Sequence, residues 1–170
     1  VPNYFGPQRF GMRCNSHKVG KLIIQGRFKD AVIEYLTAFE NSEPGDVKYA
    51  KSELLHTMDY KKALKEFPTH LKYERVLLEH LAKKPNDYIG ALRRLPRGLS
   101  LMFVHAYQSY LFNKVLSEKI LEGVEIEEGE YHCGMNWYSF PDIEKINGKF
   151  PVGKLIGYET KVNPRERRIL

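Results

Sequence analysis

The sequence is poor in cysteine: Cys14 and Cys133 are the only two in 170 residues. Two thiols so far apart predict a reducing, cytoplasmic setting rather than a scaffold held by several disulfides. The chain also lacks an apolar run long enough to cross a bilayer, and it shows no signal-peptide pattern. We therefore expect no membrane partner.

Common catalytic and metal-binding motifs are missing as well. There is no CxxC or HExxH spacing, and His132 and Cys133 are adjacent, which disfavours both closing on one tetrahedral ion. The segments "GKLIIQG" and "GKLIGYE" lack the glycine spacing of a phosphate-binding loop or dinucleotide fingerprint, and no GxSxG elbow is present. The sequence thus predicts no metal and no cofactor, and it gives no support for a generic small-molecule enzyme.

Negative charge is absent from the first part of the chain. No acid precedes Asp30, and the same stretch carries six cations: Arg9, Arg13, Lys18, Lys21, Arg27 and Lys29. A second basic cluster consists of Arg93, Arg94 and Arg97, and a third is "PRERR" at 164–168. Localised positive charge attracts phosphates, so a nucleic-acid partner is plausible. A solvated basic face is the alternative, and charge alone would favour it.

What is present suits a soluble core, with 42% hydrophobic and 28% charged residues. Apolar residues at helical spacing predict helices over 27–40 and 71–84. Candidate caps, among them Asn15 and Ser16, and glycine and proline breaks predict further helices over 16–25, 47–58, 59–67 and 87–96. Gly26 should end the helix over 16–25, and Asp46 should cap the helix over 47–58. His80 falls on the apolar stripe of 71–84, which predicts a partly buried structural histidine rather than a ligand.

The longest helix is predicted from Ser100, as its N-cap, to Gly123. Its first half is apolar around nearly the whole circumference, which predicts a buried spine. Gln108 and Asn113 are polar groups on this spine, and we expect them to bond neighbouring backbone rather than RNA.

The composition of the sequence changes after residue 130. "YHCGMNWYSF" and "KFPVGKLIGYETKV" are rich in aromatic and β-branched residues and interrupted by glycine, which predicts short strands and turns. The predicted fold class is α+β: helices for most of the chain, then a smaller strand-rich C-terminal section.

The stretch "NYFGPQRFGMR", residues 3–13, is poorly suited to a hydrophobic core, because polar residues and glycines separate its aromatic rings. Aromatic rings beside arginines on a loop suit a surface that stacks an unpaired base and grips its backbone. Asn3 and Gln8 add amides that could read a base edge or orient a carboxylate. The alternative is a buried turn with Phe5 and Phe10 as core residues. The residues alone do not favour the RNA-binding surface over the buried turn.

Resemblance to a known protein family favours the RNA-binding interpretation. "VPNYFGPQRFG" resembles the second signature motif of the TruD family of tRNA pseudouridine synthases: an Asn, an aromatic, Phe-Gly, any residue, then Gln-Arg-Phe-Gly. "NSHKVGKLIIQGRFKDAV", "LRRLPRGLSLMFVHAYQSYLFN" and "PVGKLIGYET" are similar to later segments of the archaeal branch. The resemblance implies that residues 1–28 are a remnant of the catalytic domain and residues 29–170 the family's insertion domain. With Val1 at one end and Leu170 at the other, the chain is expected to be a fragment.

The resemblance also implies an activity, the isomerisation of uridine to pseudouridine at position 13 of tRNA. It implies no cofactor and two partners, tRNA and the remainder of the catalytic domain. The nucleophilic aspartate of the family stands in a Gly-x-Lys-Asp-type motif that precedes the one found here, and a later motif lies beyond Leu170. The segment by itself is therefore expected to be inactive.

Residue roles follow from the same resemblance. Asn3 would hold the aspartate or the base, and Phe5 would be the ring against which the detached uracil rests. The clustering of positive charge, and not the resemblance, assigns RNA contacts to Arg13, Arg93, Arg94 and Arg97. Arg9, within the motif, is a candidate for a phosphate contact or for an internal salt bridge. Two alternatives stay open: a non-catalytic RNA-binding module, and a helical interaction domain without an RNA role.

Overall fold

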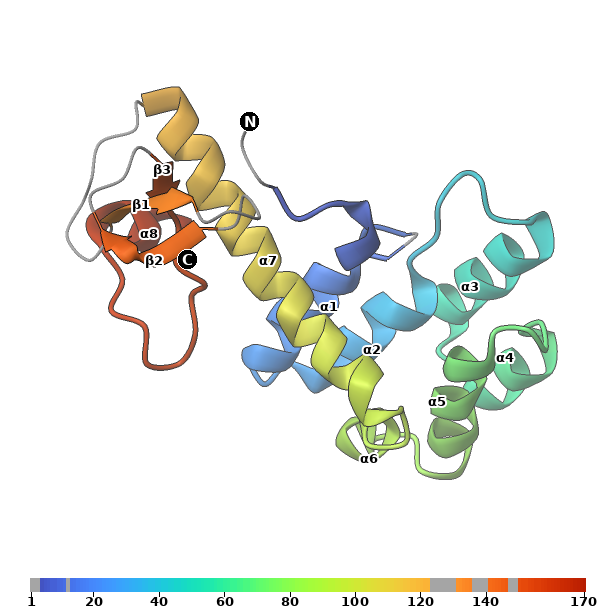
Figure 1. The fold of residues 1–170 in the computed structure, drawn as a ribbon. Coiled ribbons are helices and arrows are strands. Elements are labelled where there is room, and N and C mark those ends of the chain that lie inside the picture. The colour runs from blue at the N-terminus through green and yellow to red at the C-terminus, as the bar shows by residue number, and fades with distance from the viewer. Residues whose placement is uncertain (1–3, 12, 123–130, 136–140, 147–149) are drawn as a thin grey trace. The chain divides into compact units, whose positions relative to one another are not determined.

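The computed structural model describes residues 4–11, 13–122, 131–135, 141–146 and 150–170 (Figure 1). The chain divides into two compact units. One is Gly6–Tyr107, and the other combines Val1–Phe5 with Gln108–Leu170. The domain boundary after residue 28 stays a prediction.

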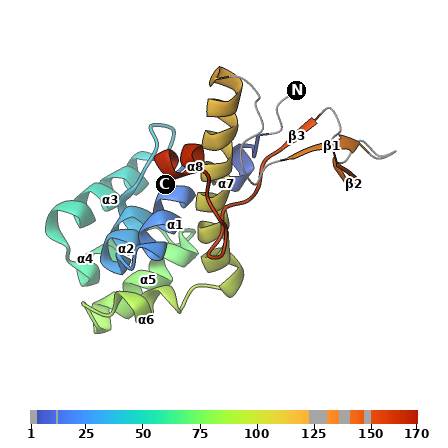
Figure 2. The same ribbon diagram turned by 90° about the vertical axis from the view of Figure 1, so that its left-hand side faces the viewer.

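The Gly6–Tyr107 unit is built from helices. Its elements are η1 (Pro7–Arg9), α1 (Ser16–Ile24), α2 (Phe28–Thr37), α3 (Gly45–Thr57), α4 (Tyr60–Glu66), α5 (Lys72–Lys83), α6 (Tyr88–Leu92) and the first part of α7 (Arg97–Glu122). Helices α1 and α2 lie side by side, as do α4 and α5 (Figures 1 and 2). One core joins them, and its fully buried members include Val32, Leu54, Leu77 and Phe103.

Local sequence explains helix α5 well. In α5, Glu74, Leu77, Leu78 and Leu81 are buried at the spacing of one helix face. Beside that face, the half-buried His80 Nε2 lies 2.8 Å from Asp87 Oδ2. The prediction of a partly buried structural histidine is confirmed.

Three sequence predictions about helix ends and faces are wrong. Helix α3 begins at Gly45 after Pro44, so Asp46 lies in the first turn rather than at the cap. Helix α7 begins at Arg97, directly after Pro96, so Ser100 is already inside it. Proline favours the position just before or at a helix start, and that preference outweighed the capping side chains. Helix α7 is also not buried all round, because Leu101 is 45% exposed.

The second unit contains the rest of α7, three short strands and a terminal helix. The strands are β1 (Tyr131–Met135), β2 (Pro141–Ile146) and β3 (Phe150–Val152), in the antiparallel order β2-β1-β3. Helix α8 (Pro164–Ile169) starts with a capping box. In this box Asn163 Oδ1 accepts from the Glu166 N–H, and the Glu166 carboxylate accepts from the Asn163 N–H.

The predicted α+β fold class is wrong. The core that the structure describes is all-helical: its members come from α1–α7 and the turns between them, and none comes from a strand. The aromatic and glycine-rich composition of the C-terminal section predicted short strands and turns there, and no helix. After Val152, however, the chain runs as turns and then as α8, because Pro164 and the capping box favour a helix there. In the described helices we find none long and apolar enough to cross a bilayer.

Candidate functional site

The first described residues of the motif lie along the C-terminal half of α7. Phe5 N–H donates to Asn113 Oδ1 at 2.9 Å, and Asn113 Nδ2 donates to the Phe5 carbonyl oxygen at 2.9 Å. The hydroxyls of Tyr4 and Ser117 are 3.1 Å apart. Both backbone polar groups of Phe5 are therefore satisfied by one side chain of α7.

The Phe5 ring is half-buried and packs edge-on against Phe112, with ring centroids 5.3 Å apart and an interplanar angle of 78°. This is a favoured aromatic geometry. Phe112 is itself tightly backed, since a Cβ added at Gly153 would lie 2.8 Å from its Cε2 atom. The Phe5 ring thus packs against a side chain, Phe112, that is itself closely packed against Gly153. Asn3, predicted beside it, lies outside the described residues.

The second half of the motif belongs to the Gly6–Tyr107 unit. It forms the single turn η1, in which the Arg9 N–H donates to the Gly6 carbonyl at 3.0 Å. The Phe10 ring packs edge-on against His17, 5.6 Å between centroids. Burial, reinforced by the charge of Lys18, lowers the pKa of His17. Gly11 has φ +76°, a conformation that glycine adopts at low cost and that lets the chain turn towards α1.

Arg13 belongs to a network of ion pairs within the same unit. Its Nε lies 2.6 Å from Glu43 Oε1, and one terminal nitrogen lies 2.8 Å from Glu74 Oε1. Lys51 Nζ lies 2.6 Å from the other oxygen of Glu43 and donates to the Ala38 carbonyl. Burial alone would lower the pKa of Arg13, but the two carboxylates outweigh it and raise that pKa. A phosphate at Arg13 would have to compete with both carboxylates.

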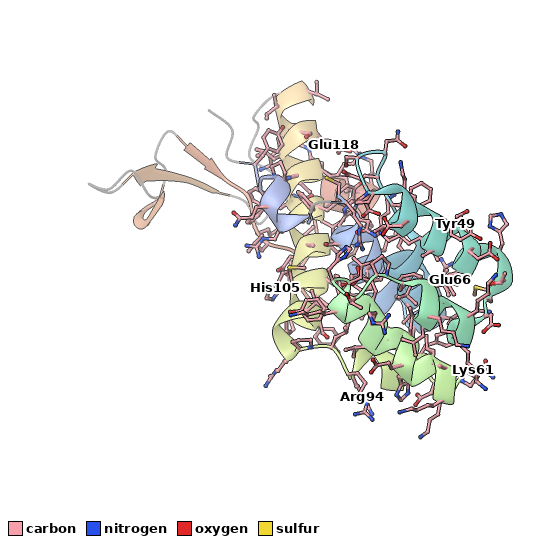
Figure 3. All side chains as sticks on the ribbon, turned by 90° about the vertical axis from the view of Figure 1, so that its right-hand side faces the viewer. Tyr49, Lys61, Glu66, Arg94, His105 and Glu118 are labelled. Carbon is pink, nitrogen blue, oxygen red and sulfur yellow. The ribbon has the colours of Figure 1, made fainter. Side chains whose placement is uncertain are left out.

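The predicted basic cluster at 93–97 lies between α6 and α7. Arg93, Arg94 and Arg97 are all exposed. Figure 3 shows the Arg94 side chain projecting outward from the turn after α6. Within the described residues, no hydrogen bond or ion pair engages these three guanidinium groups. Arg97 opens the first turn of α7, which contains no acid. A cation there opposes the helix dipole, and a bound anion would relieve the repulsion.

The structure brings Phe5 together with residues that sequence reasoning did not place in the site. Phe112 and Ser117 had no recognisable signal beyond their position on a helix. Asn113 did have a signal, because a polar residue on an apolar helix must be paired, and its predicted bond to neighbouring backbone is confirmed. The same prediction for Gln108 is confirmed by its bond to the Ile156 carbonyl at 2.9 Å. Among the described side chains, no three of the His, Cys, Asp or Glu type cluster as metal ligands would.

Comparison with known proteins gives a consistent result. The family model described as "tRNA pseudouridine synthase D (TruD)" matches residues 1–168. A relative from Methanosarcina acetivorans, named "Probable tRNA pseudouridine synthase D", is 42% identical over 149 residues, which is 85% of this chain and 34% of the relative. A relative of the same name from Methanopyrus kandleri is 48% identical over 128 residues, 74% of this chain and 32% of the relative.

A solved structure agrees in fold. The crystal structure of a Methanosarcina mazei protein described as a TruD superposes with a TM-score of 0.76 at 38% identity, covering 99% of this chain and 38% of that one. This chain therefore spans about a third of the length of the relatives that it matches. The motif at 3–11 and the segments on α7 resembled this family, and the match now extends over almost every residue. The chain belongs to the TruD family of tRNA pseudouridine synthases.

Proposed function

We propose that this chain is part of a cytoplasmic enzyme that converts uridine to pseudouridine in tRNA, at position 13. In this reaction the bond between N1 of uracil and C1′ of ribose breaks, the base turns, and a bond forms between C5 and C1′. C5 loses its proton and N1 gains one, so no oxidant, reductant or cofactor is consumed. The observation that carries the proposal is family membership along the chain, together with the placement of the motif residue Phe5.

Phe5 is proposed as the ring that supports the uracil while it is detached. The target nucleotide must leave its stack, which costs roughly a few kcal/mol that contacts in the pocket must offset. An aromatic face can supply such contact without hydrogen bonds, so it tolerates the rotation of the base. Asn3 is proposed to hold the base or the aspartate that the family supplies from outside these residues.

Arg93, Arg94 and Arg97 are proposed to contact tRNA phosphates. They are exposed and carry no partner within the described part of the chain, unlike Arg13, whose guanidinium is held by two carboxylates. Arg9 is kept as a possible phosphate ligand. A non-catalytic RNA-binding role is the second candidate for this segment, and these same arginines favour it.

The first prediction concerns Phe5. In the full-length enzyme, Phe5→Ala should lower kcat about 100-fold, because loss of a positioning contact at a reacting group typically costs that much. The measurement is tritium release from tRNA transcribed with [5-³H]uridine, since the reaction removes the hydrogen from C5. Phe39→Ala is the matched control: it removes an equal ring from a residue that is 46% exposed, and it should leave kcat unchanged. Full activity of Phe5→Ala would refute the role of the ring, and no turnover by the wild type would favour the non-catalytic candidate.

The second prediction concerns the basic cluster. Replacing Arg93, Arg94 and Arg97 by glutamate should weaken tRNA binding and reduce the slope of log K against log salt by about 2 to 3, roughly one per lost phosphate contact. The control places glutamate at three exposed lysines on α2 and α4, Lys29, Lys61 and Lys65, with the same change in net charge. Equal salt slopes for the two triple variants would show that only net charge matters and would remove the cluster from the interface.

A further inference from the structure

Asn113 lies on α7 with its side-chain amide turned to the backbone of Phe5. Its Oδ1 accepts from the Phe5 N–H and its Nδ2 donates to the Phe5 carbonyl, both at 2.9 Å. In extended backbone the N–H and C=O of one residue point the same way, which is how antiparallel strands exchange paired hydrogen bonds. Asn113 therefore takes the place of a neighbouring strand for this one residue. Among the side chains near Asn in size, only an amide offers a donor and an acceptor at this spacing.

A second contact fixes the same segment. The Ser117 hydroxyl donates to the Asn113 carbonyl at 2.9 Å. Because its only proton is used there, the hydroxyl must accept from the Tyr4 hydroxyl, 3.1 Å away. Tyr4 and Phe5 are thus both tied to one face of α7, across 108 or more positions of sequence.

The orientation of the Phe5 ring follows from these ties. The backbone bonds set where its Cβ lies and in which direction it points, and the edge-on contact with Phe112 limits the remaining side-chain rotation. Without the amide of Asn113 the Phe5 backbone would lose these two hydrogen bonds, and the direction of its Cβ would be less tightly fixed.

We propose that Asn113 is a positioning residue for the reaction: it holds the Phe5 backbone so that the ring faces the substrate base in one orientation. The inference rests on the proposed function of Phe5. Asn113 acts through Phe5 and touches no RNA, so its loss should lower kcat and leave tRNA binding nearly unchanged.

The test uses the full-length enzyme with Asn113→Leu, which keeps the side-chain size and removes both hydrogen bonds. Asn113→Asp is the second variant: it keeps an acceptor for the Phe5 N–H and loses the donor for the carbonyl, and it serves where the leucine variant fails to fold. Gln108→Leu is the matched control, because it removes another amide-to-backbone bond of α7 in the same unit, to Ile156 rather than to Phe5. Two readouts are taken: hydrogen exchange of the peptide containing Tyr4 and Phe5, and kcat and KM from tritium release.

The expected result is faster exchange at Phe5 in Asn113→Leu and a loss in kcat of about 10- to 100-fold, the usual range for residues that orient a functional group, with KM changed less than about threefold. Asn113→Asp should fall between this variant and the wild type. Gln108→Leu should keep kcat and the exchange rate at Phe5.

Three results would overturn the inference. Unchanged exchange would show that the amide does not hold Phe5, and unchanged kcat despite faster exchange would show that holding Phe5 does not matter for the reaction. Equal losses in Asn113→Leu and Gln108→Leu would indicate general destabilisation of α7. In each of these cases the wild type still turns over and the proposed function survives. A wild-type enzyme without turnover would instead refute the function itself, and the inference with it.

Discussion

Replacing Gly20 by alanine should destabilise the protein by about 3 kcal/mol or more, at the upper end of the cost of overpacking. Gly20 lies in α1 where it crosses α7. A Cβ added there would lie 2.0 Å from the Phe103 carbonyl oxygen, 2.6 Å from its carbonyl carbon and 3.2 Å from Tyr107 Cβ. The first two are backbone atoms of a helix, so no side-chain rotation can make room. The two helices would have to separate, which opens the core around Val19 and Phe103.

The measurement is urea unfolding of the full-length protein, followed by circular dichroism. Gly98→Ala is the matched control, because Gly98 lies in the first turn of α7 with nothing within 4 Å of its added Cβ. That change should be neutral or should stabilise by about 0.5–1 kcal/mol, since alanine loses less conformational freedom in a helix than glycine. Equal stability of Gly20→Ala and Gly98→Ala would mean that α1 and α7 do not approach as closely as the structure has them.

Gly20 illustrates what local sequence can and cannot predict. The helix over 16–25 and its end at Gly26 were predictable, because residues that favour a helix start and a glycine that can adopt positive φ at its end are local signals. The need for glycine at position 20 comes from a residue 83 positions further along the chain. No pattern within α1 carries that information, and only the packing of α7 supplies it.

In the candidate site, too, local features could be predicted from the sequence and long-range contacts could not. The motif was recognisable from its own residues, and the pairing of Asn113 with backbone was predictable because a polar residue on an apolar helix must be satisfied. That its partner would be Phe5 was not predictable, because the contact spans 108 positions. The ion pairs of Arg13 were not predictable either. The basic N-terminal stretch suggested phosphate ligands, but the carboxylates that pair with Arg13 come from distant parts of the sequence, Glu74 in α5 and Glu43 in the turn before α3.

The ion pairs that join Arg13, Glu43 and Lys51 lead to a second prediction about stability. Replacing Glu43 by glutamine should cost about 3 kcal/mol, the lower end of the usual loss when one partner of a buried ion pair is removed, because Lys51 is buried but Glu43 is itself 16% exposed. Lys51 is 0% exposed, and in Glu43→Gln its ammonium would keep the Ala38 carbonyl and at most an uncharged amide oxygen at position 43. Burial already lowers the pKa of Lys51, and the hydrogen bond to Glu43 opposes that shift. Losing Glu43 would therefore leave a buried charge with little compensation.

A surface pair of equal length is the control. Lys62 Nζ lies 2.6 Å from Glu53 Oε1, the same separation as Lys51 and Glu43, but the Lys62 side chain is 43% exposed. Glu53→Gln should cost much less than Glu43→Gln, because water screens exposed pairs. In the double variant Glu43→Gln with Lys51→Met, the loss should be smaller than the sum of the two single losses, since no unpaired ammonium remains buried.

The pH dependence follows from Glu43. Burial would raise the pKa of this carboxyl, but hydrogen bonds from Lys51 and Arg13 outweigh burial and lower the pKa below its ordinary value of 4.5. A carboxyl whose pKa is lower in the folded state stabilises the fold above its unfolded pKa, and this contribution disappears as the pH falls through the folded value. The difference in unfolding free energy between wild type and Glu43→Gln should therefore be constant near neutral pH and shrink below about pH 4.5. A difference that stays constant to pH 3 would mean that Glu43 contributes through shape and not through charge.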